Sequence, residues 1–499
     1  MSTIRESAYA GGVYTAAQAR ELDRLAAASF EVPAQTLMER AGRAAAQFID
    51  AQWPLAQRIV IVCGPGNNGG DGYVLARLLR QSRREVSVYA AQDRLPEGGE
   101  AAVAARAWMD AGGRPSSFSG TLPDADLVVD ALFGIGLSRP PEGAYADLIE
   151  AMNAQSAPIL SLDVPSGVDA DTGAVPGVAV TAAATLSFIV LKQGLLTGSA
   201  CNHTGNLWVD DLDLPKVLFA CVPAATQLLR PAQLQDWLPR RARDAHKGDF
   251  GHVLVVGGDE GYGGAVRLAA EAAARVGAGL VSVATRAIHV PAILAARPEL
   301  MVRGVAGPGD LEALLEQASV VVVGPGLGRS TWSEILLAAV TERGLPTVMD
   351  ADALNLLAQA ACVLPEQVVI TPHPGEAGRL LDLSTAEVQG NRFEAAQRLA
   401  EFFQATVVLK GAGTLVCDGP HGLSLCASAN PGLATGGTGD VLAGCIGGLM
   451  AQGLSAAAAA RAAVVLHAEA GRAAAEQGER GLLASDLYPH LRRLANPQG

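Results

Sequence analysis

The chain has 499 residues, of which 49% are hydrophobic and 17% charged, a composition that excludes a generally disordered protein. It is too long for one ordinary core, so we expect two large domains. The net charge of -13 argues against broad electrostatic attraction to nucleic acids or to anionic membranes.

The amino-terminal segment and the cysteines indicate the compartment. Residues Met1 to Arg24 contain no apolar run of the length that a secretory signal needs. The seven cysteines are scattered, and no pair has metal-ligand spacing, which suits a reducing environment. Two uncharged stretches, Thr172–Leu191 and Val441–Ala460, approach the length of a membrane span, but glycines and polar residues interrupt them. We expect a cytoplasmic protein with no membrane or nucleic-acid partner. We also expect a homo-oligomer of unspecified size.

Short β-branched runs alternate with Ala- and Leu-rich stretches at helical spacing, which predicts an α/β fold in both halves. Continuous apolar runs of this kind are typical of parallel strands that are covered on both faces. The predicted strands are Arg58–Cys63, Leu127–Val129, Ile159–Leu162 and Thr185–Leu191 in the first half, and His252–Val256, Leu280–Ala284, Val320–Val323, Thr347–Met349, Val368–Ile370 and Thr406–Leu409 in the second.

The strand Arg58–Cys63 opens into the glycine-rich segment Gly64–Gly72, which is followed by a predicted helix at Tyr73–Arg80. This segment lacks the Gly-Lys-Ser/Thr ending of a Walker loop and the G-x-G-x-x-G spacing of a dinucleotide fold. Its amides and Asp71 suit hydroxyls, amides or a cation. A purely structural loop, rich in turns, is an equal alternative.

Two later strands of the first half end in carboxylates, at Asp130 and Asp163. Oxygen atoms that converge at neighbouring strand ends can hold a hard cation. Each aspartate could instead cap a helix or form a turn.

Over residues 14–220 these motifs resemble the NAD(P)H-hydrate epimerases, which implies a Rossmann-like three-layer domain. The resemblance implies a substrate pocket lined by Asn67, Asn68, Gly69, Gly70, Asp71, Gly134, Ile135, Gly136, Leu137, Ser138, Arg139, Pro140 and Asp163. It also implies that Asn68, Asp130 and Ser166 bind K⁺, and Asp163 is our candidate acid/base. Related epimerase-like domains also occur in an mRNA-decapping scaffold, but the intact Asn and Asp motifs favour catalysis here.

The segment Asp210–Arg243 contains four prolines, and neither helical nor strand periodicity persists in it. A strand-loop-helix pattern restarts at Phe250. We therefore predict a boundary near residue 225, which gives domains at 1–225 and 226–499.

In the second half, the loop Gly436–Asp440 leads directly into the apolar, helical stretch Val441–Met450. The free N–H groups at a helix amino terminus bind anions, and glycines let a phosphate approach closely. Asp440 then lies where a carboxylate could take a proton from a hydroxyl that attacks the phosphate. The alternative is a glycine turn that Asp440 merely caps.

Two further strands of the second half end in polar loops. Thr406–Leu409 precedes Lys410–Thr414, a cation followed by glycines, and Val368–Ile370 precedes His373 and Glu376. Ligands of open α/β sheets bind at such carboxyl ends. The alternative for His373 is a loop residue bonded to the backbone.

Five ordered motifs over residues 226–495 resemble the nucleotide-dependent NAD(P)H-hydrate dehydratases of the ribokinase-like superfamily. They are Lys247–Gly251, Gly324–Gly328, Asp350–Asn355, the His373 motif and Gly436–Asp440. The resemblance implies that the nucleotide is bound by Lys410, Gly411, Ala412, Gly413, Thr414 and Gly439. It also implies that the hydrated substrate contacts Ala265, Gly326 and His373, with Asp440 beside the reacting hydroxyl.

Together the resemblances imply a repair enzyme for NADH and NADPH that carry water at C6 of the nicotinamide ring. The first domain would interconvert the R and S hydrates. The second would phosphorylate the S hydroxyl with ADP or ATP and Mg²⁺, after which phosphate leaves. The rival hypotheses are a vitamin-pathway kinase of the same superfamily and a non-enzymatic scaffold. The choice between ADP and ATP stays open.

Overall fold

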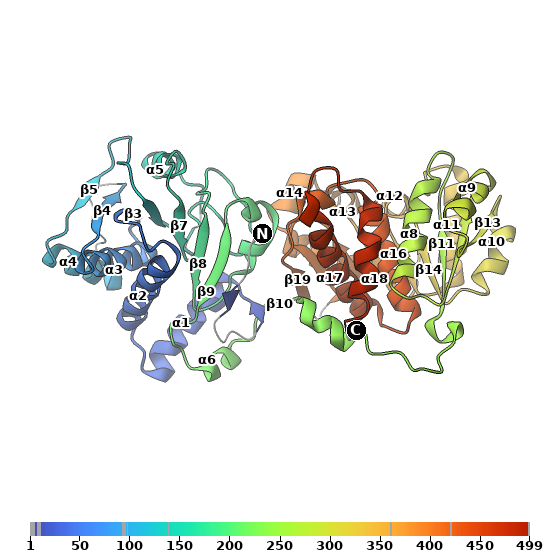
Figure 1. The fold of residues 1–499 in the computed structure, drawn as a ribbon, viewed down its shortest axis with the longest axis horizontal. Helices are drawn as coiled ribbons and strands as arrows, with labels where there is room; N and C mark the ends of the chain where they lie inside the picture. Colours follow the sequence, from blue (N-terminus) through green and yellow to red (C-terminus); the bar gives the residue numbers. More distant parts are fainter. Residues whose placement is uncertain are drawn as a thin grey trace. The chain divides into compact units, whose positions relative to one another are not determined.

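The computed structural model describes residues 5–6, 11–91, 96, 98–137, 139–359, 362–419 and 422–497. Its internal contacts divide the chain into two compact units, Met1–Gln227 and Leu228–Gly499. In Figure 1 the first unit runs from blue to green and the second from green to red.

The first unit contains an eight-stranded sheet in which neighbouring strands run parallel. In spatial order the strands are β1 (Arg5–Glu6), β9 (Asn206–Asp210), β8 (Ala184–Phe188), β7 (Ile159–Leu162), β6 (Leu127–Ala131), β3 (Arg58–Cys63), β4 (Glu85–Ala90) and β5 (Pro115–Ser117). From β3 the chain first adds strands on one side and then on the other. The resulting switch point, between β3 and β6, is where open sheets form ligand crevices.

Helices cover both faces of this sheet, so the unit has three layers, as predicted. Alternate residues of a strand point to opposite faces. Ile59 and Ile61 pack among residues of α1 (Ala16–Phe30), α2 (Ala34–Gln52), α3 (Asn67–Gln81) and α4 (Gly99–Asp110), whereas Val60 and Val62 pack with α5 (Ala144–Asn153). Figure 1 shows α2, α3 and α4 together and α5 on the other side. The remaining elements are α6 (Lys216–Cys221), β2 (Gly12–Val13) and β10 (Thr226–Leu228).

Two predicted boundaries in the first unit differ most from the structure. Strand β8 ends at Phe188 instead of Leu191, because Ile189 adopts a φ of 65° and turns the chain. Helix α3 begins at Asn67 instead of Tyr73. Gly69 lies inside this helix, where an added Cβ would be 1.9 Å from the carbonyl oxygen of Gly64. The glycine therefore serves close helix packing, although glycine itself disfavours helices.

The second unit contains a mixed sheet. The strands run in the order β13 (Met301–Gly304), β12 (Leu280–Thr285), β11 (His252–Val256), β14 (Val320–Val323), β15 (Thr347–Met349), β16 (Val368–Ile370), β17 (Thr406–Leu409), β18 (Thr414–Cys417) and β19 (Leu423–Cys426). All neighbours from β13 to β17 are parallel, and β17, β18 and β19 are antiparallel. The predicted parallel strands are confirmed, whereas the β18–β19 hairpin was not predicted.

The core of the second unit lies between this sheet and α8 (Gly263–Arg275), α16 (Thr438–Ala451), α17 (Ala456–Ala474) and α18 (Leu487–Leu494). The other helices are α7 (Leu234–Trp237), α9 (Val290–Ala296), α10 (Pro308–Leu315), α11 (Thr331–Arg343), α12 (Asp352–Leu357), α13 (Pro374–Leu381), α14 (Thr385–Gly390) and α15 (Arg392–Phe403). Because β16 and β17 are parallel neighbours, the loops that follow them meet at the same edge of the sheet.

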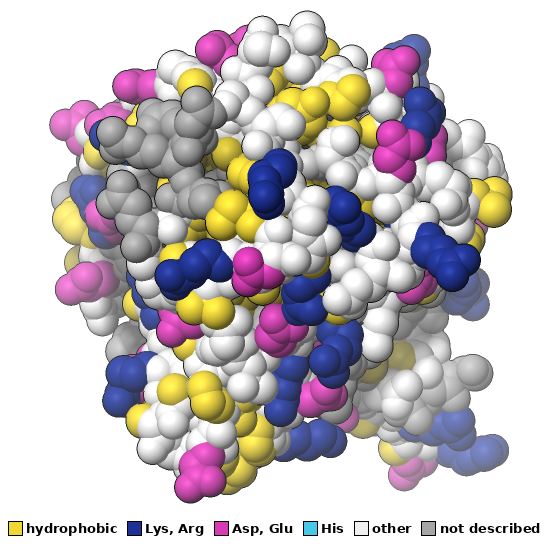
Figure 2. Space-filling view, turned by 90° about the vertical axis from the view of Figure 1, so that its left-hand side faces the viewer, with side chains coloured by type: hydrophobic (Ala, Val, Ile, Leu, Met, Phe, Trp, Pro, Cys, Tyr) yellow, Lys and Arg dark blue, Asp and Glu magenta, His cyan; other side chains and the backbone are white. Residues whose placement is uncertain are grey.

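The two uncharged stretches are parts of these packed units. Thr172–Leu191 contains β8, and Val441–Ala460 contains most of α16 and the start of α17. Among the helices of the described residues, none combines the length and the apolarity that crossing a bilayer requires. On the face seen in Figure 2, basic, acidic and hydrophobic side chains are interspersed. That face therefore does not carry charge of one sign.

Candidate active sites

A cavity of about 540 Å³ lies in the first unit, at the carboxyl ends of β3, β6 and β7. This is the switch point of the sheet. Seven of the residues predicted for the pocket line it: Asn67, Asn68, Asp71, Gly134, Ile135, Gly136 and Asp163. The fold therefore brings together segments that are separated by almost a hundred residues in the sequence.

The other predicted pocket residues lie elsewhere or cannot be described. Gly69 and Gly70 are buried within α3, where they pack against Gly64 and Met38. Leu137, Arg139 and Pro140 follow the cavity-lining segment and are not part of its wall. Ser138 lies outside the described residues.

Asp163 follows β7 with a left-handed φ of 65°, which is unusual for a residue other than glycine. Its Oδ1 accepts a hydrogen bond from Lys192 Nζ and a long one, 3.4 Å, from the backbone N–H of Phe188. Oδ2 faces Gly134, because a Cβ added to that glycine would lie 2.8 Å from it. One carboxylate oxygen is thus paired, while the other is directed toward a glycine of the cavity wall.

Lys192 and Asp23, which were not predicted from the sequence, also line the cavity. Lys192 is only 2% exposed and donates to Phe188 O at 2.7 Å and to Ser187 Oγ at 3.2 Å besides its bond to Asp163. In the sequence, its position as a single lysine at the end of an apolar run was the feature that could have indicated Lys192 as a site residue. Asp23 lies on the amphipathic helix α1, where an acidic residue gives no such signal.

Asp130, which lies near the end of β6, and Ser166, which follows β7, are buried and hydrogen-bonded to each other, and Asn68 is buried at the start of α3. The two oxygens of Asp130 accept four hydrogen bonds, from Ser161 Oγ, from Leu132 N and from both N and Oγ of Ser166. Burial raises the pKa of Asp130, and the bonds from Ser166 and Ser161 oppose that shift. Asn68 Nδ2 donates to Leu162 O, whereas its buried Oδ1 has no hydrogen-bond partner in the described part of the chain.

In the second unit, Gly437 caps α16 with a φ of 94°, and Gly439 and Asp440 lie in the first turn of that helix. The predicted loop before the helix is therefore shorter than expected. A Cβ added to Gly439 would lie 3.3 Å from Lys410 Nζ, so the predicted nucleotide loop meets the helix amino terminus. Free N–H groups and an ammonium group converge there, an arrangement that suits phosphate.

Asp440 is part-buried beside this ammonium group. Burial raises the pKa of its carboxyl to about 7, and the negative charge of Asp350 adds to the shift. A carboxylate with a pKa near the operating pH is suited to general base catalysis.

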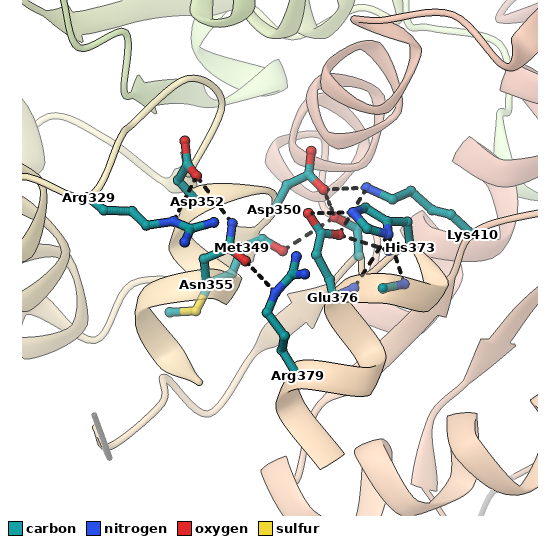
Figure 3. A network of polar contacts seen from close by, with 11 residues as sticks. Arg329, Met349, Asp350, Asp352, Asn355, His373, Glu376, Arg379 and Lys410 are labelled. Atoms are coloured by element: carbon teal, nitrogen blue, oxygen red, sulfur yellow. Dashed lines mark hydrogen bonds and ion pairs between the residues drawn. The ribbon is translucent and has the colours of Figure 1, made fainter. Parts of the chain in front are cut away.

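Figure 3 shows the polar network around Lys410. Lys410 Nζ lies 2.7 Å from Asp350 Oδ1 and 3.7 Å from Glu376 Oε2. Although burial opposes its charge, these carboxylates raise the pKa of Lys410. Asp350 Oδ1 also accepts from Thr371 Oγ1 at 2.7 Å. The ammonium group is therefore held at the end of β17 by groups that follow β15 and β16.

His373 forms hydrogen bonds to the backbone, which is the alternative role that the sequence allowed for it. It is the amino-terminal cap of α13, and its Nδ1 accepts from the N–H groups of Gly375 and Glu376 at 2.9 and 3.4 Å. Nδ1 therefore carries no proton, and burial lowers the pKa of the ring. The side chain is 50% exposed, so contact between Nε2 and substrate stays a prediction.

Ala265 and Gly326 are neighbours, as expected for residues of one pocket. A Cβ added to Gly326 would lie 3.1 Å from Ala265 Cβ, and the φ of Gly326 is 56°. Gly328 N donates to Asp352 Oδ2 at 2.9 Å, and Asp352 is linked to Asn355 in the network of Figure 3. These bonds connect the Gly324–Gly328 loop to the segment that begins at Asp350.

Arg392, which no sequence motif indicated, shapes the predicted nucleotide-binding loop Lys410–Thr414. Its guanidinium is fully buried and donates through Nη2 to the carbonyl oxygens of Leu409, Lys410 and Gly413 at 3.1 to 3.4 Å. Nη1 donates to Gln389 Oε1 at 2.6 Å. Arginines of amphipathic helices are usually exposed, so the sequence carried no signal for this role.

Comparisons with known proteins agree with both resemblances. A family model described as NAD(P)H-hydrate dehydratase matches residues 253–493, and one described as YjeF-related protein N-terminus matches residues 34–194. The chain is 51% identical to the bifunctional NAD(P)H-hydrate repair enzyme Nnr of Coxiella burnetii over 97% of this chain and 99% of that one. It is 45% identical to the Escherichia coli enzyme of the same name, over 97% and 94% of the two chains.

Solved structures resemble the second unit. A ribokinase-like superfamily protein from Enterococcus faecalis is 32% identical with a TM-score of 0.52, covering 55% of this chain and 96% of that one. The ADP/ATP-dependent NAD(P)H-hydrate dehydratase of Bacillus subtilis, co-crystallized with ATP/Mg²⁺, is 30% identical with a TM-score of 0.50, covering 54% and 98%. Because the relatives from Coxiella burnetii and Escherichia coli match 97% of this chain at 51% and 45% identity, the chain belongs to the family of bifunctional NAD(P)H-hydrate repair enzymes.

Proposed function

We propose that the chain restores NADH and NADPH from their hydrates by two reactions. The first unit interconverts the R and S hydrates, and the second uses ADP or ATP to dehydrate the S hydrate. The observation that carries this proposal is the position of Asp440, with a pKa of about 7, beside Lys410 and the glycine-bounded start of α16. The relatives named bifunctional match almost the whole chain, which supports a separate reaction site, for epimerisation, in the first unit.

In the second unit, Lys410–Thr414 and Gly439 bind the phosphates, while Ala265, Gly326 and His373 contact the hydrate. Asp440 takes the proton of the C6 hydroxyl as its oxygen attacks the terminal phosphorus of the nucleotide. Phosphate then leaves C6 with the electron pair of the C–O bond, and loss of a proton from C5 restores the double bond. Phosphorylation converts hydroxide into a better leaving group.

Mg²⁺ fits this site through the nucleotide. Mg²⁺ typically takes one or two carboxylates together with substrate phosphates, and Asp350 and Glu376 provide carboxylates next to Lys410. The ion would offset the negative charge of the phosphates. Among the described residues there is no cluster of three or more His, Cys, Asp or Glu that could hold a metal alone.

K⁺ fits the first unit through Asn68, Asp130 and Ser166. The buried Oδ1 of Asn68 has no hydrogen-bond partner among the described residues, and K⁺ prefers oxygen donors of this kind. The ion would fix the end of β6 against the start of α3. Asp163, whose Oδ2 faces the cavity wall, is the acid/base candidate.

The proposal is tested with purified protein, ADP or ATP, Mg²⁺ and a mixture of R and S hydrates, by following NADH absorbance. Full recovery is expected. Recovery of the S fraction alone refutes an active epimerase, and accumulation of a stable phosphorylated alcohol without recovery favours a kinase. Exchange of K⁺ for Na⁺ tests the potassium site. We also propose a cytoplasmic location, which the scattered positions of the seven cysteines support. We further propose a homo-oligomer, and light scattering in solution tests the assembly.

A further inference from the structure

Two carboxyl groups on the wall of the first unit's cavity have opposite surroundings. Asp163 Oδ1 is paired with Lys192 and bonded by Phe188 N, whereas no hydrogen bond from the described residues reaches Oδ2. Asp71 belongs to α3, and its carboxyl has no hydrogen-bond partner in the described part of the chain. Both residues line the same cavity. The carboxylate of Asp163 is thus paired with the ammonium group of Lys192, whereas the carboxyl of Asp71 forms no ion pair among the described residues.

The charges around Asp71 favour its neutral form. The titratable groups that face it are Asp23 from α1, Cys63 at the end of β3, Asp163 after β7 and Lys192 after β8. Burial raises the pKa of Asp71 well above its usual value, and the negative charges of Asp163 and Asp23 raise it further. Lys192 opposes this shift without cancelling it. Burial and the neighbouring negative charges therefore favour the protonated form of Asp71, whereas Asp163 is paired with the ammonium group of Lys192. Two carboxyls in such unlike environments mark an acid/base pair.

We propose that Asp71 is the general acid and Asp163 the general base of the epimerisation, with Lys192 as a positioning residue that holds Asp163. This inference rests on the epimerase function proposed above. Lys192 acts by fixing Oδ1, which leaves Oδ2 as the oxygen that can accept a proton. Asp71 acts because its proton has no competing acceptor among the described residues.

The hydrate carries its hydroxyl on C6, which is bonded to the ring nitrogen N1. Asp163 takes the hydroxyl proton, and the oxygen forms a carbonyl with C6. The C6–N1 bond breaks, its electron pair goes to N1, and N1 takes the proton of Asp71. Rotation about the C5–C6 bond presents the other carbonyl face. Ring closure reverses each transfer, so that both residues regain their starting states and no oxidant is needed.

The test uses the full chain and purified R hydrate without nucleotide, so that only epimerisation proceeds. Formation of the S hydrate is followed by chromatography. We expect Asp71→Asn to lower kcat by about 10²–10⁴ with KM within about threefold, because the amide keeps the shape but cannot donate the acid proton. Asp71→Glu should recover part of the loss. Asp147→Asn, an exposed aspartate in the first turn of α5, is the matched control.

Lys192→Met should also lower kcat more than it raises KM. The double variant Lys192→Met with Asp163→Asn should be no slower than Asp163→Asn alone, because the lysine acts through the aspartate. Additive losses would show that Lys192 acts independently.

Nucleotide and S hydrate are then added to each variant, and the rate of NADH recovery should equal that of the wild type. This step shows that the second unit is intact, and an unchanged thermal unfolding profile of the full chain shows that the first unit is folded. The assignment of the acid would be overturned if Asp71→Asn epimerised the hydrate at the wild-type rate. It would also be overturned if Asp23→Asn lost epimerase activity while Asp71→Asn did not. A wild-type chain that cannot epimerise would instead refute the proposed function itself.

Discussion

Replacing Gly439 by alanine should weaken nucleotide binding without weakening the fold. Gly439 is the second residue of α16, and an added Cβ would lie 3.3 Å from Lys410 Nζ and 3.8 Å from Asp350 Oδ2. The methyl group would occupy space at the helix amino terminus that a phosphate needs to reach the free N–H groups. The ammonium of Lys410 would also have to move by a few tenths of an ångström.

The size of the effect follows from the bonds involved. Loss of one hydrogen bond to a charged group costs about 1.5–3 kcal/mol, which raises the nucleotide Kd roughly 10- to 160-fold. Alanine is better than glycine in a helix by up to about 1 kcal/mol, and the close contact with Lys410 offsets part of that gain. We therefore expect the Tm to stay within about 4 °C of the wild type.

Isothermal titration of ADP or ATP with Mg²⁺ measures the Kd, and calorimetry measures the Tm. Gly309→Ala is the matched control, because Gly309 is also the second residue of its helix, α10, and an added Cβ would meet nothing within 4 Å. The control should keep the wild-type Kd. An unchanged Kd for Gly439→Ala, in a protein of unchanged Tm, would refute a phosphate at this helix terminus.

The further predictions concern three residues of the second unit. Asp440→Asn should lower kcat for dehydration by about 10²–10⁴ and leave epimerisation intact, and loss of both activities in folded protein would argue against two separate sites. Because the base form of Asp440 is needed and its pKa is about 7, wild-type kcat should rise as the pH increases through about 7, as a pH–rate profile would show. Arg392→Met should destabilise the protein by about 2–4 kcal/mol in urea unfolding and raise the nucleotide Kd, because it leaves three carbonyl groups, two of them in buried bonds, without this donor; equal stability would contradict this role. His467, which bonds to Thr438 O at 2.9 Å, has its pKa lowered by burial to about 4. Between pH 6.5 and 4, His467 therefore binds a proton in the unfolded chain but not in the folded chain. At pH 5 this difference lowers the free energy of unfolding by about 2 kcal/mol. His467→Gln should lose less stability between pH 7 and pH 5 than the wild type, and an equal loss would contradict the neutral histidine.

The sequence predicted most strands correctly because buried parallel strands are short apolar runs with clear ends, as at Val320–Val323. It also predicted that polar segments after several strands would meet, since parallel strands end at one edge. It could not give the start of α3, because Asn-Asn-Gly-Gly has low helix propensity and its glycines instead serve close tertiary packing, such as that of Gly69 on Gly64.

The residues that the sequence missed act through partners distant in the chain. Lys192 is 29 positions from Asp163, and Arg392 is 17 positions from Leu409. Neither pairing leaves a local pattern, because periodicity reports only which face of an element is apolar. Such residues become visible only when the tertiary contacts are known.

The close contact of Gly69 with Gly64 has a consequence for ligand recognition. An atom added at Gly69 would overlap the backbone of Gly64, the residue after β3, so the first turn of α3 packs directly on the end of that strand. The positions of Asn68 and Asp71 are therefore set by main-chain packing rather than by long flexible side chains. A site built in this way loses little conformational entropy when a ligand binds, so more of the contact energy is available for affinity. Any larger residue at Gly69 would shift Asn68 and Asp71 together, so that a change in packing would weaken ligand binding.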